Sequence, residues 1–530
     1  MPIVKKKFIF FLFIYTVLAF YTSAYAPIFE STEARYAEIA REMIQSGNFI
    51  EPYFNGIKHF HKPPLTYWFI ASGMKIFGIN NFGSRFFGII ASIITLVFTV
   101  KLSKFFIREE ERYYAAYVLS SSILFLTVSR IAATDIYLTM FTVISQYYYF
   151  NQVYYKKDTK NAILIGIFLG FGFITKGPII FLFTLLPFFV MKFFDYHFRK
   201  VFSFKDVILS TISFIAVSLP WYLIVIIKNP GLLNYFLKVQ TIERITTNRF
   251  NREKPFYFFF GTVFVSTLPY SILIITKIKQ LFSNYKSHIT LIVYIITPFI
   301  IFSIAKSKLH SYLTPLTPIM SILVLKLYTE YCKPIFNKIV LYFAALLPIT
   351  FIIATFLLKE LRFNLTIIIL SIISIAFVVI SRKKIENHLF SYNLGLIVVI
   401  IFNIIYYSSS IFQDKLMGFE NMVNAANIID PDRKLEALCY KRDLPSTSFY
   451  RNKITVMAHG TTRETQFEKD DNYKKYYIQT EDEMKSFIKS NSSFFLFTKG
   501  ALNEFKDKYR IDCEEKYIQR DYSLSLCKSN

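Results

Sequence analysis

The sequence predicts an all-α polytopic membrane protein, with about thirteen transmembrane helices and a small soluble α/β domain at the C-terminal end. Three observations lead to this prediction. The 530 residues are 54% hydrophobic and 19% aromatic, with 60 Phe and a mean hydropathy of +0.39. Apolar runs of roughly 17 to 22 residues recur through most of the chain. From about Asp414 onward, the hydropathy drops and short strand-like and helix-like segments alternate.

The first apolar run follows Lys5, Lys6 and Lys7 in the manner of a signal peptide. No convincing small-residue cleavage site follows it, so we expect an uncleaved anchor. The predicted spans are 8–27, 84–100, 113–129, 134–153, 161–175, 177–194, 206–227, 256–276, 289–305, 310–328, 338–357, 364–380 and 391–411.

Basic residues gather in every second connection between these spans, which predicts a cytoplasmic N-terminus. The basic connections include Lys101, Lys104, Arg108 and Arg112, then Lys192, Arg199, Lys200 and Lys205, then Lys277, Lys279 and Lys286. A short connection with Lys359 and Arg362 goes against the pattern. The segment 28–83, the loop 228–255, the turn at Lys306–His310 and the C-terminal region then lie outside the cytoplasm.

The net charge of +25 does not indicate a nucleic-acid partner, because no basic face accompanies a nucleic-acid-binding motif. We attribute the charge to membrane topology and to attraction by anionic membrane lipids. The predicted domains are therefore a transmembrane domain over 1–412, which includes the loop 28–83, and a soluble α/β domain over 413–530 on the outer side of the membrane.

The C-terminal domain is predicted from segments with strand or helix periodicity. KITVMAHG, KKYYIQT and SFFLFTKG indicate strands, whereas DEMKSFIKS and GALNEFKDKY indicate helices. The four cysteines Cys332, Cys439, Cys513 and Cys527 lack metal-binding spacing. One disulfide is possible in this region, with Cys513 and Cys527 as the candidate pair, and it would leave one cysteine over.

The loop 28–83 is the most informative segment, because it brings charges of both signs next to the membrane. STEARYAEIAREMIQSG predicts a helix that Ser31 or Thr32 caps and Gly47 ends. Glu33 heads its apolar stripe, and the charged residues lie elsewhere on the surface, so we expect an amphipathic, interfacial helix. These charged residues are Arg35, Glu38 and Glu42 on the opposite face, and Arg41 at the side.

Two carboxylates in this loop are candidate catalytic groups. Glu33 is either a carboxylate aimed into a cavity at the membrane surface or a first-turn acid favoured by the helix dipole. Glu30, just before the helix, is either a partner in acid/base or metal chemistry or a solvated loop acid.

The loop continues with HFHKPPLTYW, in which two prolines follow Lys62 and a second amphipathic helix begins. Lys62 is held extended, and it either binds a phosphate or snorkels to lipid head groups. His59 and His61 share one side of an extended strand and could bind a divalent metal, although no second pair has zinc spacing. The alternative for each histidine is a structural role at the interface.

These motifs resemble the first periplasmic loop of bacterial GT-C glycosyltransferases of the protein O-mannosyltransferase-like superfamily, in particular the aminoarabinose transferases acting on lipid A. The resemblance rests on EARYAEIAREM, KPPLTYW and FGINNFGSRFFG, followed by ATDIYLTMF, TKGP, LPWYLIVIIKNPG and SIAKSKLHSYLTPLTP. It covers about residues 8–330 in order, whereas the later spans and the C-terminal region match only in length and layout.

The resemblance implies an inverting glycosyltransferase that moves a sugar from a polyprenyl-phosphate donor to an envelope acceptor on the periplasmic side. The acceptor would be lipid A, another glycolipid or a protein hydroxyl. Two departures leave the catalytic group open between Glu33 and Glu30, because Thr32 and His61 stand where the family usually has acids. A phosphate acceptor is already ionised and needs no base.

A polyprenyl phosphate leaves readily when cations stabilise its charge. The predicted phosphate-binding residues are Lys62, Arg35, Arg244, Lys306, Lys308 and Tyr312, of which Tyr312 is named from the family match alone. Asp135 and Lys176 are further candidates, with a helix N-cap and a tight turn as their respective alternatives. For the lysines and arginines the alternative is head-group contact or a solvated loop.

Two other functions fit a polytopic protein. A lipid-linked-sugar flippase or transporter should show internal repeats and charges in mid-span, but the charges here gather at the outer edge. A non-catalytic envelope scaffold would have its C-terminal domain as the working part. Sugar transfer by the purified protein separates these alternatives from the transferase.

Overall fold

The computed structural model describes residues 2–529 except 156, 248–251, 332–333, 383–388, 461–464 and 469–470. Cys332 lies outside the described residues. The chain divides into two compact units, each built from two separate stretches of sequence. Unit 1 comprises Met1–Thr22 and Gly88–Tyr406, and unit 2 comprises Ser23–Phe87 and Tyr407–Asn530.

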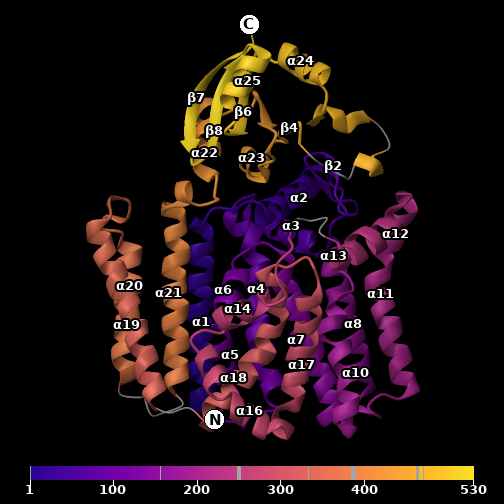
Figure 1. Ribbon diagram of the computed structural model, residues 1–530, viewed down its shortest axis with the longest axis vertical. Helices are drawn as coiled ribbons and strands as arrows, with labels where there is room; N and C mark the ends of the chain where they lie inside the picture. The colour runs from indigo at the N-terminus through magenta and orange to yellow at the C-terminus, as the bar shows by residue number, and fades with distance from the viewer. Residues whose placement is uncertain are drawn as a thin grey trace. The chain divides into compact units, whose positions relative to one another are not determined.

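Within the described residues, eight helices are long and apolar enough to cross a membrane. They are α1 (Pro2–Tyr25), α4 (Asn81–Ser103), α8 (Thr159–Lys176), α11 (Phe204–Lys228), α17 (Tyr285–Ile304), α19 (Pro334–Leu357), α20 (Leu365–Arg382) and α21 (Leu389–Ile411) (Figure 1). The predicted count of thirteen is therefore not confirmed, although the prediction of an α-helical polytopic protein is.

The difference arises because several predicted spans are broken helices. The run 113–129 forms α5 (Tyr114–Leu119) and α6 (Ile123–Val128). Between them, the hydroxyls of Ser120 and Ser121 both donate to the Tyr117 carbonyl, and Ser122 caps α6. Such breaks are tolerated in a membrane protein where the backbone is buried in protein.

Prolines lie at the other breaks. Pro187, the third residue of α10, has no N–H to donate to the Phe183 carbonyl, and α9 ends at Phe183. Pro269 separates α14 from α15, and Pro315 lies in the 3₁₀ segment before α18. The remaining helical segments of unit 1 are α7 (Thr134–Tyr154), α9 (Ile179–Phe183), α10 (Leu185–Phe194), η1 (Tyr196–Phe198), α12 (Leu232–Asn234), η2 (Tyr235–Ile242), α13 (Glu243–Thr246), α14 (Phe258–Ser266), α15 (Ser271–Thr276), α16 (Ile278–Ser283), η3 (His310–Leu316), α18 (Thr317–Tyr331) and η4 (Lys359–Leu361).

Small residues let α8 and α11 pack closely along their lengths. A Cβ added at Gly166 would lie 2.1 Å from the Ser210 carbonyl oxygen, and one at Gly170 would lie 2.8 Å from the Val217 Cβ. The two glycines therefore fix the distance between these helices, because backbone and branched side chains cannot give way.

Unit 2 contains a six-stranded mixed sheet and the loop between α1 and α4. The strand order is β5-β4-β3-β6-β8-β7, with β3, β4, β5 and β6 parallel and the β7–β8 hairpin antiparallel at one edge. Its elements are α2 (Thr32–Ser46), β1 (Tyr53–Phe54), β2 (Ile57–Lys58), α3 (Leu65–Phe77), η5 (Gln413–Lys415), α22 (Glu420–Ile429), β3 (Glu436–Tyr440), α23 (Pro445–Arg451), β4 (Val456–Ala458), η6 (Thr465–Phe467), η7 (Asp471–Lys475), β5 (Tyr477–Ile478), α24 (Glu481–Ser490), β6 (Ser493–Lys499), α25 (Leu502–Tyr509), β7 (Asp512–Gln519) and β8 (Tyr522–Lys528).

The three predicted strand segments contain β4, β5 and β6, and the two predicted helices are α24 and α25, so these predictions are confirmed. Strand β6 is buried on both faces of the sheet, because Phe494 and Leu496 join one core while Phe495 and Phe497 join the other. Strands β3, β7 and β8 were not predicted.

The predicted helix in the loop is confirmed as α2, and Gly47 ends it in a left-handed conformation with φ of 69°. The predicted exposure of its charged face is wrong. Glu38 and Arg41 are fully buried and Glu42 is 5% exposed. The reason is that α3 and α23 both pack against α2, and β1 lies beside it, so little of the helix is left for lipid head groups.

The disulfide considered from the sequence forms between Cys513 and Cys527, which face each other across β7 and β8, whereas Cys439 is a buried free thiol.

We expect a reductant to lower the melting temperature of the protein, because breaking the disulfide Cys513–Cys527 removes about 2–3 kcal/mol from the free energy of unfolding of the C-terminal domain. Scanning calorimetry with and without reductant measures this shift. The Cys439→Ser variant should show the same shift in melting temperature. A C513S/C527S variant whose melting temperature still falls with reductant would contradict the prediction.

Candidate functional site

The carboxylate of Glu33 forms a buried bidentate ion pair with Arg85, the fifth residue of α4. Arg85 Nε lies 2.8 Å from Oε1 and Nη2 lies 2.9 Å from Oε2. Nη1 and Nη2 donate the other three guanidinium hydrogens to the carbonyl oxygens of Ser23, Ala26 and Pro27, with N···O distances of 2.5–3.0 Å. All five donors of the guanidinium are thus used.

Glu33 is therefore fully engaged in holding the loop. Its Oε2 also accepts the Phe29 backbone N–H at 3.0 Å, and its side chain is 2% exposed. The Ser31 hydroxyl makes no capping bond to α2. The acid thus tethers the start of α2 to the ends of α1 and α4, a geometry that suits a structural ion pair better than a proton carrier.

Glu30 has a different environment, although it lies only three residues away. Its Oε1 accepts the Ser446 backbone N–H at 2.8 Å, and its Oε2 is buried with no hydrogen-bond partner among the described residues. Burial raises the pKa of Glu30 to about 7, against the opposing effect of the Ser446 bonds. This carboxyl group can therefore change its protonation state near neutral pH, as general acid/base catalysis requires.

A second acid of raised pKa belongs to the same cluster. Burial raises the pKa of Asp443 to about 6, while the positive charge of Arg35 lowers it. The charge of Asp443 in turn raises the pKa of Glu30, and Arg35 lowers that as well. Arg35 Nε is also buried without a partner among the described residues. Two carboxyl groups thus interact with one guanidinium.

Asn55 connects this cluster to the charged residues of α2. Its side-chain amide donates to Asp443 Oδ1 at 3.2 Å and accepts the Ser448 hydroxyl at 2.8 Å. Its backbone N–H donates to Glu42 Oε1 at 2.6 Å from a left-handed conformation with φ of 50°. The loop and the start of α23 are therefore joined by a continuous network of polar contacts.

The KPP motif lies in unit 2 before α3, and Pro64 forms the N-cap of that helix. Lys62 and His61 are half-buried and His59 is buried, and the two imidazole rings are 4.1 Å apart. Across the described residues, no group of three or more His, Cys, Asp or Glu side chains could hold a metal ion. The metal site predicted at His61 therefore stays a prediction.

In unit 1 the structure brings three of the predicted residues together. Lys176 Nζ lies 2.5 Å from Asp135 Oδ1, and both side chains are about nine-tenths buried. The Lys176 ammonium also lies 5.0 Å from the centre of the Tyr312 ring. Lys176 ends α8 before Gly177, whose φ is 78°, so the predicted turn is present as well as the ion pair.

The remaining predicted cations of unit 1 are Lys306, Lys308 and Arg244. Lys306 is exposed, whereas Lys308 is buried and its Nζ donates to the Lys254 carbonyl at 2.9 Å. Burial lowers the pKa of Lys308. The side chain of Arg244 lies outside the described residues.

Sequence reasoning missed four residues with functional geometry, namely Arg85, Arg130, Asp443 and Ser446. Arg130 is fully buried, donates from Nη1 to the Tyr15 and Ser129 hydroxyls, and has no partner for Nε or Nη2 among the described residues. Charge at the edge of an apolar run was the one signal that pointed to Arg85 and Arg130. Asp443 and Ser446 gave none, since they are unremarkable in a soluble segment.

Part of the chain matches a known family. Residues 61–221 match the family described as dolichyl-phosphate-mannose-protein mannosyltransferase. The undecaprenyl phosphate-alpha-4-amino-4-deoxy-L-arabinose arabinosyl transferase 1 of Proteus mirabilis is 30% identical over 324 residues, which cover 60% of this chain and 58% of that protein. The corresponding transferase of Edwardsiella ictaluri is 28% identical over 301 residues, covering 54% of this chain and 53% of its own length. The match thus spans little more than half of these relatives.

The likeness in structure extends over the whole chain. The crystal structure of ArnT from Cupriavidus metallidurans bound to undecaprenyl phosphate superposes with a TM-score of 0.81 at 15% identity, over 98% of this chain and 97% of that one. The predicted fold class is confirmed by this match, and the transferases of similar sequence imply a multi-pass inner-membrane protein. The chain therefore has the GT-C fold of ArnT, and in sequence it resembles the bacterial aminoarabinose transferases.

Proposed function

We propose that this protein is an integral-membrane glycosyltransferase that moves a sugar from a polyprenyl-phosphate donor to an envelope acceptor. The observation that carries the proposal is a carboxyl group, Glu30, poised near neutral pH in the loop that carries the family motifs. The ArnT fold and the arabinosyl transferases of similar sequence favour transfer over a flippase or a scaffold. The acceptor is lipid A, another glycolipid or a protein hydroxyl.

The proposed orientation has the N-terminus in the cytoplasm and the C-terminal α/β domain, 413–530, in the periplasm. The alternation of basic connections along the sequence supports it. A disulfide in that domain also supports it, because disulfides persist in the periplasm and are rare in the cytoplasm.

In the proposed reaction, Glu30 takes the proton from an acceptor hydroxyl as the acceptor oxygen attacks the anomeric carbon of the sugar. The bond from that carbon to the phosphate oxygen breaks on the opposite face, so the configuration inverts and polyprenyl phosphate leaves as an anion. Lys62 and Arg35 stabilise the phosphate. Within unit 1, the Lys176 ammonium lies between the Asp135 carboxylate and the Tyr312 ring, and this group is proposed as a second candidate for donor binding.

The direct test is transfer by the purified full-length protein. The probes are undecaprenyl phosphate-linked 4-amino-4-deoxy-L-arabinose and an undecaprenyl phosphate-linked hexose, each with lipid A or a hydroxylated peptide as acceptor. Formation of a glycosylated acceptor together with free undecaprenyl phosphate supports the proposal. Movement of the intact donor across the bilayer with no transfer to any acceptor would instead favour the flippase.

We expect transfer to a hydroxyl acceptor to rise with pH through a midpoint near 7, since Glu30 acts as a base only when ionised and burial raises its pKa to about 7. Glu30→Gln should lower kcat about 10²–10⁴-fold and remove this inflection. The same shift affects the free energy of unfolding. The contribution of Glu30 to it is fully present below the ordinary pKa of 4.5 and is lost as the pH rises towards 7. Initial rates and melting temperatures over this range measure both effects.

Two neighbouring substitutions should move this midpoint in opposite directions. Asp443→Asn removes a negative charge that raises the pKa of Glu30, so the midpoint falls. Arg35→Gln removes a positive charge that lowers it, so the midpoint rises. A midpoint that neither variant moves would assign the titration to another group.

Glu33→Gln should destabilise the protein by about 3–5 kcal/mol, because it leaves the buried guanidinium of Arg85 without its counter-charge. Replacing both partners, as Glu33→Leu with Arg85→Met, should restore much of the loss. Urea unfolding of the three proteins measures it. If Glu33→Gln instead folds normally and abolishes transfer, Glu33 is the catalytic carboxylate and the assignment of Glu30 fails.

Lys62→Met should weaken binding of undecaprenyl phosphate about tenfold, through loss of one charge-assisted contact, whereas Lys62→Arg keeps most of the affinity. Lys75→Met is the matched control, since Lys75 is an exposed lysine of α3 that lies over the Phe49 ring. Isothermal titration in detergent measures the affinities. Equal losses at both positions would leave Lys62 as a head-group contact.

A further inference from the structure

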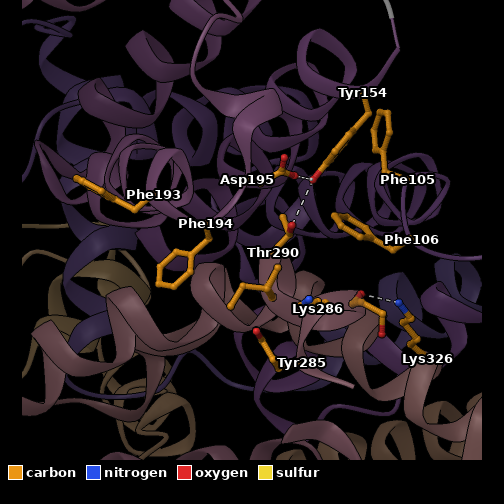
Figure 2. A pocket seen from close by; sticks show the side chains of 12 residues that line it. Phe105, Phe106, Tyr154, Phe193, Phe194, Asp195, Tyr285, Lys286, Thr290 and Lys326 are labelled. Atoms are coloured by element: carbon orange, nitrogen blue, oxygen red, sulfur yellow. Dashed lines mark hydrogen bonds between the residues drawn. The ribbon is translucent and has the colours of Figure 1, made fainter. Parts of the chain in front are cut away.

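Unit 1 contains a cavity of about 580 Å³ that the transfer reaction does not use. Four helices and the connection after α4 contribute to it: it lies at the ends of α7 and α10, at the start of α17 and beside α18. The residues that define its chemistry are Tyr154, Phe193, Phe194, Asp195, Lys286 and Lys326 (Figure 2). By the order of the connections, this is the edge that bears the basic connections of the chain.

The polar wall of the cavity is built from Tyr154, Asp195 and Thr290, as the dashed lines in Figure 2 show. The Tyr154 hydroxyl donates to Asp195 Oδ2 at 3.4 Å and lies 3.2 Å from Thr290 Oγ1. Asp195 Oδ1 also accepts the His197 backbone N–H at 2.9 Å. The acid is therefore held by Tyr154 of the wall and by His197, which lies two residues further along the chain.

Two lysines give the cavity a positive charge, against the single acid in its lining. Lys326 Nζ donates to the Ser287 carbonyl at 2.7 Å, which fixes its ammonium beside the start of α17. Lys286 is exposed in the first turn of that helix, where the helix dipole adds positive potential. The part of the cavity formed by Lys286 and Lys326 therefore favours an anionic ligand.

The rim of the cavity is aromatic and uncovered. Phe193 is 81% exposed, Phe194 is 59% exposed and Tyr285 is 48% exposed. A small soluble anion would leave these rings unused. A ligand with an anionic group next to an apolar chain would cover them and meet the lysines at once, and basic pockets between membrane helices bind phospholipid head groups in this way.

We propose that this cavity binds an anionic bilayer phospholipid, with its phosphate at Lys286 and Lys326 and its acyl chains along Phe193 and Phe194. The site goes beyond the proposed transfer reaction. It requires neither a sugar donor nor an acceptor, so its test is independent of activity.

The test uses the full-length protein in nanodiscs of phosphatidylcholine that contain a fraction of phosphatidylglycerol with a photoreactive acyl chain. After illumination, mass spectrometry should find the label on peptides that carry Phe193, Phe194 or Tyr285. Lys286→Glu should lower this labelling about tenfold, since each lysine near a membrane contributes several-fold to the binding of anionic lipid. Lys286→Gln should give a smaller loss, and melting temperatures confirm that the variants fold.

Lys279→Glu is the matched control, because Lys279 is an exposed lysine of α16 at the same edge and does not line the cavity. It should leave the labelling unchanged, and an equal loss there would reduce the effect to general surface charge and overturn the proposal. Photoreactive phosphatidylcholine that labels the same peptides equally would also overturn it. So would displacement of the lipid by millimolar inorganic phosphate, which would make the site one for free phosphate.

Discussion

The loop between α1 and α4 depends on one interaction, the buried ion pair of Glu33 with Arg85. A guanidinium without partners in such a place would destabilise the fold by several kcal/mol. Here each of its donors ends on an oxygen, and those oxygens belong to the end of α1, the turn that follows and the start of α2. The ion pair thus fixes where α2 begins, and with it the positions of Glu30 and Arg35.

The same loop shows how environment separates two identical side chains. Glu33 has a cation against both oxygens, whereas Glu30 has one backbone amide and an oxygen with no partner among the described residues. The first arrangement holds a carboxylate in one place. The second leaves the charged form poorly stabilised, so the proton stays mobile near neutral pH.

The sequence predicted well what local periodicity determines, namely the apolar spans, helix α2 with its terminal glycine, and the strands β4 to β6. It failed where distant segments decide. The burial of Glu38 and Glu42 depends on α23 and on Asn55, and the breaks within four spans depend on serines and prolines that a hydropathy average does not register. The proposed choice of Glu30 over Glu33 rests on two distant residues. Arg85 lies 52 residues from Glu33, and Ser446 lies 416 residues from Glu30.

The bond from Ser446 to Glu30 also has a consequence for biosynthesis. Its two residues are separated by almost the whole membrane domain, at a distance of 416 positions along the chain. At roughly 5–20 residues per second, the ribosome reaches Ser446 tens of seconds after it has made Glu30. A nascent chain therefore lacks the Ser446 contact of the proposed acid/base group Glu30 until the C-terminal segment has been made and has folded.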